Sequence, residues 1–387
     1  MILQDILYKV SIRSVKGNTN IEVADLQLDS RKISKDSCFI AVKGVAADGH
    51  AFIDTAIEKG AAVIICEKMP ATINANITYV EVDNSVVAAG FISHNFYGET
   101  STKVKLVGVT GTNGKTTTTR LTAHICKSAG KKVGYTTSDG VYIQNQLMMK
   151  GDCTGPVSST FVLKDPTVDF AVLECARGGI LKSGLAFQNC DVAVVTNVAS
   201  DHIGLGGINN LEQMAKVKGV LPETVFKHGY TVLNADDDLV YDMRKNLECN
   251  IALVSMQENN PRIKEHSAAN GLSCIFENGF ITILKGSWKI RVMKATEIPI
   301  TFEGKALHNI ANVLSAVMAS YLFRDISIDD IRMALQTFVP GSVTTPGRMN
   351  FFHFKNFTIL ADFAHNPHGL ELLCDFVSKT DYPTKVG

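Results

Sequence analysis

Apolar residues occur along much of the chain in short uninterrupted runs, separated by longer stretches in which apolar and polar residues mix. A run without polar alternation is typical of a strand that is buried on both faces of a sheet. The longer stretches can form helices, so the pattern predicts a doubly wound, mostly parallel α/β sheet. Between residues 104 and 340 the strands are expected at 106–109, 133–136, 170–173, 192–196 and 231–233.

The first part of the chain repeats this alternation on a smaller scale. It predicts a small α/β N-terminal domain, residues 1–103, in front of a central domain, residues 104–340. Within the first domain, strands are expected at 38–42, 61–66 and 79–82, and helices at 2–10, 51–59 and 85–96.

The pattern becomes richer in strands after residue 250. Residues 250–305 read as β-structure, with a hairpin around the Glu277-Asn278-Gly279 stretch. A helix with an apolar face is expected from His308 to about Leu322.

A boundary follows at Pro346-Gly347-Arg348. After it we expect one strand at 357–361 and one helix at 368–379. Roughly 45 residues are too few for a stable α/β unit. We therefore interpret residues 341–387 as a truncated α/β C-terminal domain.

Composition narrows the class of protein. The chain has 387 residues with 38 Lys+Arg and 38 Asp+Glu, so no charge bias favours nucleic acid or a membrane as a partner. Nine cysteines occur without a C-x-x-C pair, which disfavours a disulfide framework and a zinc knuckle and fits a reducing compartment. The N-terminus does not read as a signal peptide, and no apolar run has transmembrane length. We expect a cytoplasmic protein.

The strongest chemical motif is the stretch KLVGVTGTNGKTTTT, residues 105–119. A strand, a glycine turn and a helix N-terminus together form a cradle for an anion. Lys115 can contact β- and γ-phosphates, and the Thr116 hydroxyl can bind Mg²⁺. Val109 stands where the strict P-loop pattern has its first glycine, so the match is the shorter TGTNGKTT form. An ordinary glycine turn is disfavoured by the Gly-Lys-Thr-Thr that follows it. The predicted phosphate-binding residues are Gly111, Thr112, Asn113, Gly114, Lys115, Thr116 and Thr117.

Polar residues follow two more of the predicted strands. Glu174 comes directly after the strand at 170–173, and Asn197, Asp201 and His202 come after the strand at 192–196. Ligands collect beyond the carboxyl ends of strands in such sheets. We therefore favour a metal or phosphate role for these residues over helix capping by Glu174 or a structural Asp–His hydrogen bond.

Other polar residues have competing interpretations. Asn309 and Asn312 share one helix face and can reach an adenine edge, although helix capping is a serious alternative. Lys216 and Lys218 read from the pattern alone as a solvated helix face. The turns at 28–31 and 43–50 can hold a diphosphate or a uracil, but taken alone they are a weak signal and ordinary loop chemistry is the favoured interpretation.

Taken together, these motifs resemble the Mur ligase superfamily, whose members join amino acids to carboxylates with ATP. They occur in the order that the family shows. The motifs that carry the resemblance are Thr110–Thr117, Glu174, Asn197 with Asp201-His202, His308-Asn309 with Asn312, Gly347-Arg348, and Asp362 with His365-Asn366-Pro367.

The resemblance divides between two branches of the family. Residues 1 to about 110 resemble the UDP-binding domain of muramyl-tripeptide synthetases, through Asp29-Ser30-Arg31 and the 43–50 stretch. From about residue 105 the chain resembles the ligase half of cyanophycin synthetases, through residues 134–140, 150–156 and 176–181. The muramyl branch implies addition of an amino acid to UDP-N-acetylmuramoyl-dipeptide, which we favour, and the other implies an aspartate-rich peptide. A nucleotide-binding fragment without ligase turnover is a third hypothesis.

The resemblance also implies roles for single residues. ATP would phosphorylate a substrate carboxylate, and an amino acid's amine would attack the acyl phosphate. Lys115, Glu174, His202 and a carbamylated Lys218, with Lys216 as its alternative, would form the catalytic centre, and Thr116, Glu174 and His202 would bind Mg²⁺. Asn309 and Asn312 would contact adenine, Arg348 the phosphates and Asp362 the ribose. The substrate would meet Ser30, Arg31, Thr154 and Arg177.

Overall fold

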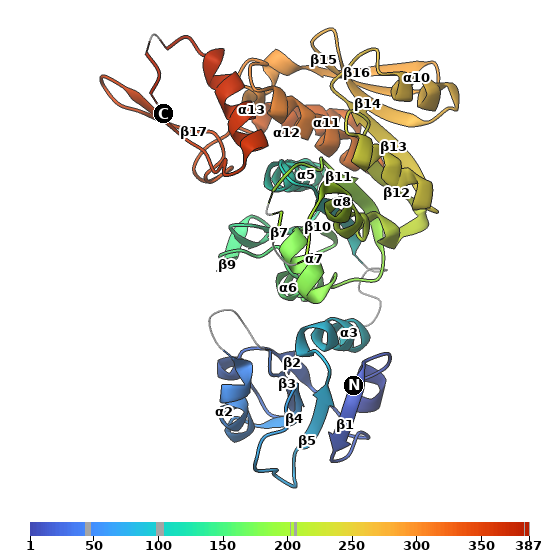
Figure 1. Cartoon of the computed structure of the whole chain (residues 1–387), viewed down its shortest axis with the longest axis vertical. Helices are drawn as coiled ribbons and strands as arrows, with labels where there is room; N and C mark the ends of the chain where they lie inside the picture. Colours follow the sequence, from blue (N-terminus) through green and yellow to red (C-terminus); the bar gives the residue numbers. More distant parts are fainter. Residues whose placement is uncertain (43–47, 98–103, 202, 205–206, 383, 387) are drawn as a thin grey trace. The chain divides into compact units, whose positions relative to one another are not determined.

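The computed structural model describes residues 1–42, 48–97, 104–201, 203–204, 207–382 and 384–386. The chain divides into two compact units (Figure 1). The first contains residues 1–102 with 182–187, and the second contains residues 103–181 with 188–387. The second unit therefore continues through the C-terminal segment, and the assignment of residues 341–387 as a domain of their own stays a prediction.

The first unit is built on a five-stranded sheet in the order β1-β5-β4-β3-β2. Strands β2 to β5 are parallel, and β1 pairs antiparallel with β5 at one edge. Alternate residues of β4 enter different cores: Val63 and Ile65 pack on one face and Ile64 and Cys66 on the other. The strands are β1 (Ile12–Lys16), β2 (Asp25–Gln27), β3 (Ser37–Ile40), β4 (Ala61–Cys66) and β5 (Thr78–Val82), and the helices are α1 (Leu3–Ile6), α2 (Ile53–Glu58) and α3 (Ser85–Tyr97).

The predicted helix over residues 2–10 is wrong in length. Helix α1 ends at Ile6, and Lys9 adopts a left-handed backbone with φ of 60°. A left-handed residue cannot continue a right-handed helix. The chain turns there into β1, a strand that the apolar pattern did not reveal because its side chains are largely exposed.

The described residues of the second unit form an 11-stranded sheet in the order β16-β15-β14-β13-β12-β11-β6-β10-β7-β8-β9. Its centre, from β14 to β7, is parallel, and antiparallel strands flank it at both edges. This arrangement confirms the predicted doubly wound α/β fold. The strands are β6 (Lys105–Thr110), β7 (Val133–Thr137), β8 (Gly140–Ile143), β9 (Gln146–Lys150), β10 (Phe170–Glu174), β11 (Cys190–Val195), β12 (Val225–Asn234), β13 (Asn250–Ser255), β14 (Leu272–Glu277), β15 (Phe280–Lys285) and β16 (Trp288–Lys294).

Helices cover both faces of this sheet. Helices α5, α11 and α12 pack on the face that receives Val107, Val194 and Val232 (Figure 1). The other face receives Val195 and Leu233 and is covered by α8, α9 and α10. The described helices of the unit are α5 (Lys115–Ser128), α6 (Pro156–Lys164), α7 (Arg177–Ser183, whose last two residues are assigned to the first unit), α8 (Leu211–Gly219), α9 (Asp238–Asp242), α10 (Pro261–Ala268), α11 (Leu307–Tyr321), α12 (Ile328–Thr337) and α13 (Pro367–Ser378).

The five strands predicted for this unit and its P-loop helix are present within a few residues. The hairpin between β14 and β15 is also confirmed, because Asn278 and Gly279, both with positive φ, form its two-residue turn. Helices α10 and α12 are among those that were missed. Helix α10 lies in the stretch read as β-structure, and α12 starts at a Ser327–Asp330 capping box. The hairpin β8–β9 was missed as well, since Gln144 and Asn145 turn it without a glycine.

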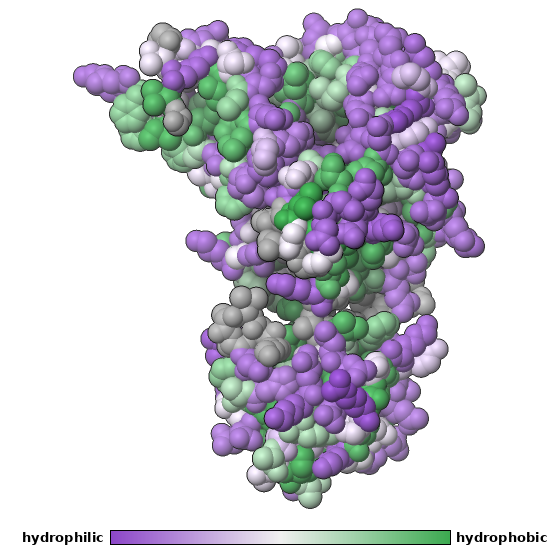
Figure 2. Space-filling model, viewed as in Figure 1, coloured by the Kyte–Doolittle hydropathy of each residue, from purple (hydrophilic) through white to green (hydrophobic). Residues whose placement is uncertain are grey.

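The C-terminal segment contains a two-stranded sheet and one helix. Strands β17 (Asn350–His353) and β18 (Thr358–Ala361) pair antiparallel and precede α13. Phe351 and Leu360 pack against the buried Phe376 of α13. The alternate residues face outward and are large and hydrophobic, and Figure 2 shows hydrophobic residues gathered around this hairpin. These exposed residues are Phe352, Phe354, Phe357 and Ile359.

Among the described residues, none of the helices is both long and apolar enough to cross a bilayer. All nine cysteines are free, and seven of them are buried. Cys66, Cys126, Cys175 and Cys190, which lie in apolar stretches of the sequence, are among the buried ones, and burial raises the pKa of each thiol.

Gly229 tests the packing of the central sheet. A Cβ at this position of β12 would lie 2.4 Å from the Asp191 carbonyl oxygen, a backbone atom that cannot move aside. We expect Gly229→Ala to lower the free energy of unfolding by about 1–3 kcal/mol. Gly219, the last residue of α8, is the matched control because a Cβ there meets open space. Urea denaturation should show Gly219→Ala unchanged or stabilised, and equal effects of the two substitutions would contradict this view of the packing.

Candidate functional site

The turn between β6 and α5 is shaped by two glycines. Gly111 has a φ of 148° and Gly114 a φ of 84°, both in the left-handed range. A Cβ at Gly111 would lie 1.9 Å from Thr196 Oγ1, and one at Gly114 would lie 2.2 Å from Asn312 Oδ1. Both positions therefore require glycine. Gly114 is the N-cap of α5, so the free N–H groups of the first helical turn face outward from this bend.

Neighbouring strand ends hold the turn in place. The Thr112 backbone N–H donates to the Asn197 carbonyl (2.9 Å), and the Asn113 backbone N–H donates to Asn197 Oδ1 (2.9 Å). Asn197 Nδ2 and Thr196 Oγ1 both donate to the Asn113 carbonyl, at 3.1 and 2.7 Å. Asn197, which was predicted from its place after a strand, thus binds the backbone of the glycine turn. A cradle built this way has its shape before any anion binds.

Lys115 begins the helix and folds back over the turn. Its Nζ donates to the Thr112 carbonyl at 2.7 Å. Burial lowers the pKa of Lys115, whereas the carboxylates of Glu174 and Asp201 raise it. The ammonium is thus held beside the helix N-terminus, where the helix dipole and the lysine attract the same negative charge.

Three oxygen-bearing residues converge next to Lys115. The Thr116 hydroxyl donates to Glu174 Oε2 at 2.9 Å and lies 3.1 Å from Ser138 Oγ. The Ser138 backbone N–H also donates to Glu174 Oε2 (3.2 Å). Because the Thr116 hydroxyl donates its hydrogen bond to the carboxylate, a lone pair of its oxygen stays available to a cation. Two hydroxyls and one carboxylate form a donor set that suits Mg²⁺.

Glu174 is 1% exposed at the end of β10. Burial raises the pKa of its carboxyl group, and Lys115 and the Thr116 hydroxyl oppose that rise. A buried carboxylate is costly without compensating charge, and a bound cation would supply it. Within the described residues no group of three His, Cys, Asp or Glu side chains gathers around a point. His202, the third predicted metal ligand, lies outside the described residues.

Ser138 was not predicted as a site residue. It directly follows β7, which neighbours β10 in the sheet. The rule that selected Glu174, a polar residue just beyond a strand, would also have selected Ser138 had it been applied to the strand at 133–136. Arg348 Nη2 donates to Ser138 Oγ at 3.4 Å. The predicted phosphate-binding arginine therefore contacts the same oxygen cluster.

Lys218 is buried on α8, at 3% exposure, and its Nζ donates to the Gly111 carbonyl at 2.7 Å. Burial, followed by the nearby positive charge of Lys115, lowers the pKa of Lys218 well below its ordinary value. A lowered pKa favours the neutral amine, which is the nucleophilic form, and this suits the predicted carbamylation. Lys216, the alternative, is exposed on the same helix. The solvated-face interpretation is therefore wrong for Lys218.

The two asparagines of α11 lie behind the glycine turn. Asn309 Nδ2 donates to the Ile300 carbonyl (2.9 Å), and Asn312 Nδ2 donates to Asn309 Oδ1 (3.2 Å). Thr118 Oγ1 of α5 lies 3.5 Å from Asn312 Oδ1. Helix capping does not explain either residue, because the N-cap of α11 is Ala306. Their contact with adenine stays a prediction.

The C-terminal segment reaches the glycine turn through Asn113. The side-chain amides of Asn113 and Asn366 exchange two hydrogen bonds, of 3.0 and 3.2 Å, and Asn113 Nδ2 also donates to His368 Nδ1 at 2.9 Å. Asn366 is the N-cap of α13. Asp362 accepts from the backbone N–H groups of Met349 and Ala364, each at 2.8 Å. Its predicted ribose contact is untested.

The predicted substrate residues divide between the two units. Thr154 is buried, and its hydroxyl donates to Asp152 Oδ1 at 2.7 Å. Its backbone packs against Gly179 of α7, the helix that begins at Arg177. In the first unit Ser30 is buried, and Arg31 is exposed and paired with Asp29 at 2.8 Å. That pairing lowers the pKa of Asp29 to about 2.

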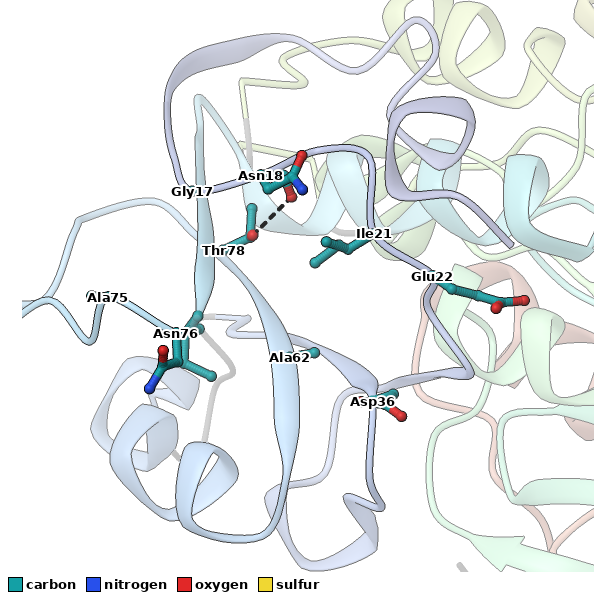
Figure 3. Close-up of a pocket in the computed structure, with 10 residues that line it drawn as sticks. Gly17, Asn18, Ile21, Glu22, Asp36, Ala62, Ala75, Asn76 and Thr78 are labelled. Atoms are coloured by element: carbon teal, nitrogen blue, oxygen red, sulfur yellow. Dashed lines mark hydrogen bonds between the residues drawn. The ribbon is translucent and has the colours of Figure 1, made fainter.

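The turn at 43–50 is described only from residue 48. The Glu67 backbone N–H donates to His50 Nε2 at 2.9 Å, so the ring proton is on Nδ1, which donates to Asp48 Oδ1 at 2.7 Å. A separate pocket of about 440 Å³ lies at the amino-terminal ends of strands β3, β4 and β5, beside Asn18, Asp36 and Thr78 (Figure 3). Its lining includes neither Ser30 nor Arg31.

The lowered pKa of Lys218 predicts how the stability of the fold depends on pH. Its folded pKa is lowered, so between that pKa and the ordinary lysine value the unfolded chain binds a proton that the folded chain does not. Stability should therefore rise with pH in this window, by up to about 1.4 kcal/mol per pH unit. Lys218→Met should reduce this slope in urea denaturation between pH 7 and 9. The matched control is Lys216→Met, which removes an exposed lysine of the same helix. An unchanged slope in Lys218→Met would contradict the assignment.

Comparisons with known proteins identify relatives of this chain and of its fold. The Mur ligase middle domain matches residues 109–320, and the Mur ligase family catalytic domain matches residues 22–97. A cyanophycin synthetase of Geminocystis herdmanii is 52% identical over 291 residues, which are 75% of this chain and 33% of that protein. The chain thus spans a third of the length of such relatives.

A UDP-N-acetylmuramoyl-L-alanyl-D-glutamate–2,6-diaminopimelate ligase of Bacteroides fragilis is 29% identical over 96% of this chain and 72% of its own length. Among solved structures, a ligase of the same name superposes with a TM-score of 0.70 at 19% identity, over 98% of this chain and 74% of that chain. The MurF ligase of Thermotoga maritima in complex with ADP gives a TM-score of 0.62 at 22% identity, over 92% and 74% of the two chains. These structures confirm the fold, and the middle-domain match, which spans more than half of the chain, confirms the resemblance found in the motifs. The chain belongs to the Mur ligase family.

Proposed function

We propose that the protein is an ATP-dependent ligase that joins a carboxylate to the amine of an amino acid through an acyl phosphate. The observation that carries this proposal is the position of Lys115 at a helix N-terminus, next to the oxygen cluster of Thr116, Ser138 and Glu174. Phosphoryl transfer depends mainly on positioning and charge neutralisation, and this arrangement supplies both. The MurF structure of Thermotoga maritima, which has the same fold, contains ADP, and this supports the proposal that this chain binds a nucleotide.

The reaction would proceed in two steps. A carboxylate oxygen of the acceptor attacks the γ-phosphorus of ATP, and the bond to the β-phosphate oxygen breaks, giving ADP and an acyl phosphate. The amine then attacks the acyl carbon, loses a proton and expels inorganic phosphate. Lys115, the amides of the first turn of α5 and Arg348 would neutralise the phosphates. The oxygens of Thr116, Ser138 and Glu174 would hold a Mg²⁺, with His202 as a further ligand, and that ion would supply additional positive charge at the phosphates.

The first candidate acceptor is UDP-N-acetylmuramoyl-dipeptide, as in peptidoglycan synthesis. A match over 96% of the chain has to include most of the first unit, and the relative that matches in this way is the diaminopimelate-adding ligase. Ser30 and Arg31 would bind the UDP part there. This proposal extends the role that the sequence motifs suggested.

The second candidate acceptor is an aspartate-rich peptide. It is favoured by the 52% identity to cyanophycin synthetase, which covers 75% of the chain. Thr154 and Arg177 would then bind the acceptor. A nucleotide-binding protein without ligase turnover remains the alternative from a different class, and a cytoplasmic location stays a prediction.

Lys115 tests the nucleotide assignment. Lys115→Ala should abolish ATP-dependent phosphate release, because it removes the buried ammonium beside the helix N-terminus, while circular dichroism shows an intact fold. Lys127→Ala, at an exposed lysine of the same helix, is the matched control and should keep wild-type turnover. Normal turnover in Lys115→Ala would remove the assignment.

The acceptor is tested with two arginine variants. Phosphate release is measured with ATP, an amino acid mixture and either UDP-N-acetylmuramoyl-dipeptide or an aspartate-rich peptide. If the UDP compound is the acceptor, Arg31→Ala should raise its KM about 10- to 100-fold, the effect of losing a charged hydrogen bond to a diphosphate. If the peptide is the acceptor, Arg177→Ala should raise the KM instead. Phosphate release that depends on neither compound would contradict both acceptors.

A further inference from the structure

A buried arginine lies on the helix that follows the glycine turn. Arg120 is in the second turn of α5, and its side chain is 4% exposed. Its Nη2 donates to the Asp139 carboxylate and to the Tyr142 hydroxyl, the latter at 2.8 Å. Its Nη1 donates to the Thr344 carbonyl at 3.2 Å. One guanidinium thus joins helix α5 to the β7–β8 hairpin and to the distant segment around Thr344.

Aromatic rings surround the Arg120 guanidinium, and its hydrogen bonds are incomplete. These features point to a role other than stability alone. The guanidinium lies 4.6 Å from the centre of the Tyr142 ring, which stacks on Tyr135 at 4.7 Å. Its Nε has no hydrogen-bond partner among the described residues, and its carboxylate partner is partly exposed. An apolar side chain of similar size often packs in such a place at no cost to stability. A buried charge that is retained in this way can instead fix the geometry of its partners.

Of the three partners of Arg120, Asp139 is the one next to the phosphate site in sequence. Asp139 follows Ser138, whose backbone N–H and hydroxyl contact Glu174 and Thr116. Asp139 is also held by Thr137 Oγ1 (2.8 Å) and by the Tyr142 hydroxyl (2.5 Å), so its position sets that of the whole β7–β8 turn. Arg120 is therefore connected to Ser138 through a hydrogen bond to Asp139 and the peptide bond between Asp139 and Ser138.

Thr344 begins the second connection. The turn that contains it is closed by a hydrogen bond from the Thr345 N–H to the Gly341 carbonyl (2.8 Å) and leads to Arg348. Arg348 in turn donates to Ser138 Oγ. The paths through Asp139 and through Thr344 thus meet at the same hydroxyl.

We propose that Arg120 is a positioning residue, which brings Ser138 and Arg348 together at the triphosphate without contacting it. The inference rests on the proposed function, because it assumes that Mg·ATP binds at Lys115. Arg120 belongs to the same helix as Lys115. The helix therefore fixes the positions of Ser138 and Arg348 relative to the glycine turn. The guanidinium fixes the β7–β8 turn, which contains Ser138, and the turn at Thr344, which leads to Arg348.

The test is the affinity of the full chain for a fluorescent ATP analogue in the presence of Mg²⁺. Arg120→Met should weaken binding about 10- to 100-fold, the cost of misplacing positioned groups by about an ångström. Arg120→Lys, which keeps the charge but not the forked geometry, should fall between Met and wild type. Arg332→Met is the matched control, because Arg332 also donates to backbone carbonyls, those of Arg291 and Val292. It should leave the affinity unchanged.

A multiple-variant cycle separates positioning from general damage. In a Ser138→Ala, Arg348→Ala background, adding Arg120→Met should change the affinity less than about twofold, because the Ser138 hydroxyl and the Arg348 guanidinium through which Arg120 acts on the triphosphate are gone. An undiminished loss in that background would overturn the inference, as would wild-type affinity in a folded Arg120→Met.

Two milder variants keep the inference testable if Arg120→Met does not fold. Tyr142→Phe and Asp139→Asn loosen the same turn without removing the guanidinium, and each should weaken binding, whereas wild-type affinity in both would overturn the inference. Failure of the wild-type chain to bind the analogue at all would instead reject the proposed function.

Discussion

The close approach of side chains to the glycine turn between β6 and α5 is the constraint on which the rest of the second unit depends. Thr196 and Asn312 come within contact distance of two backbone positions that have no Cβ. The turn is therefore clamped between the end of β11 and helix α11, and α5 starts at a fixed place and direction. Lys115, Thr116 and, one turn later, Arg120 take their positions from that start.

Burial of charge is the second feature of the site. Lys115, Lys218 and Glu174 are buried ionisable side chains around the glycine turn, and burial opposes the charged form of each. The carboxylates of Glu174 and Asp201 act on Lys115 with opposite charge, and Arg348 acts on both Lys115 and Glu174. A triphosphate bound together with its cation would add negative charge beside the lysine and positive charge beside the carboxylate, and would reduce the cost of burying both.

Sequence reasoning predicted the parts of this site that follow from local rules. The glycine turn, the buried strands and Glu174 each have a physical signature in a few consecutive residues. Ser138 escaped because the strand-end rule was not applied to β7. Arg120 has no local signature, since its importance comes from Asp139 and Thr344, which only tertiary structure brings to it. Helix α12 was overlooked although Ser327 and Asp330 form a readable capping box, and α1 was overextended because nothing in the apolar pattern marks Lys9 as left-handed.

The paired amides of Asn113 and Asn366 have a thermodynamic consequence. Each amide satisfies the other, so moving one of them leaves an unmatched donor and acceptor on its counterpart. Asn366 also begins α13, and the start of that helix is thereby tied to the conformation of the glycine turn. Two segments separated by some 250 residues of chain are therefore energetically linked: whatever favours one conformation of the turn must, to the same degree, favour one arrangement of the C-terminal helix.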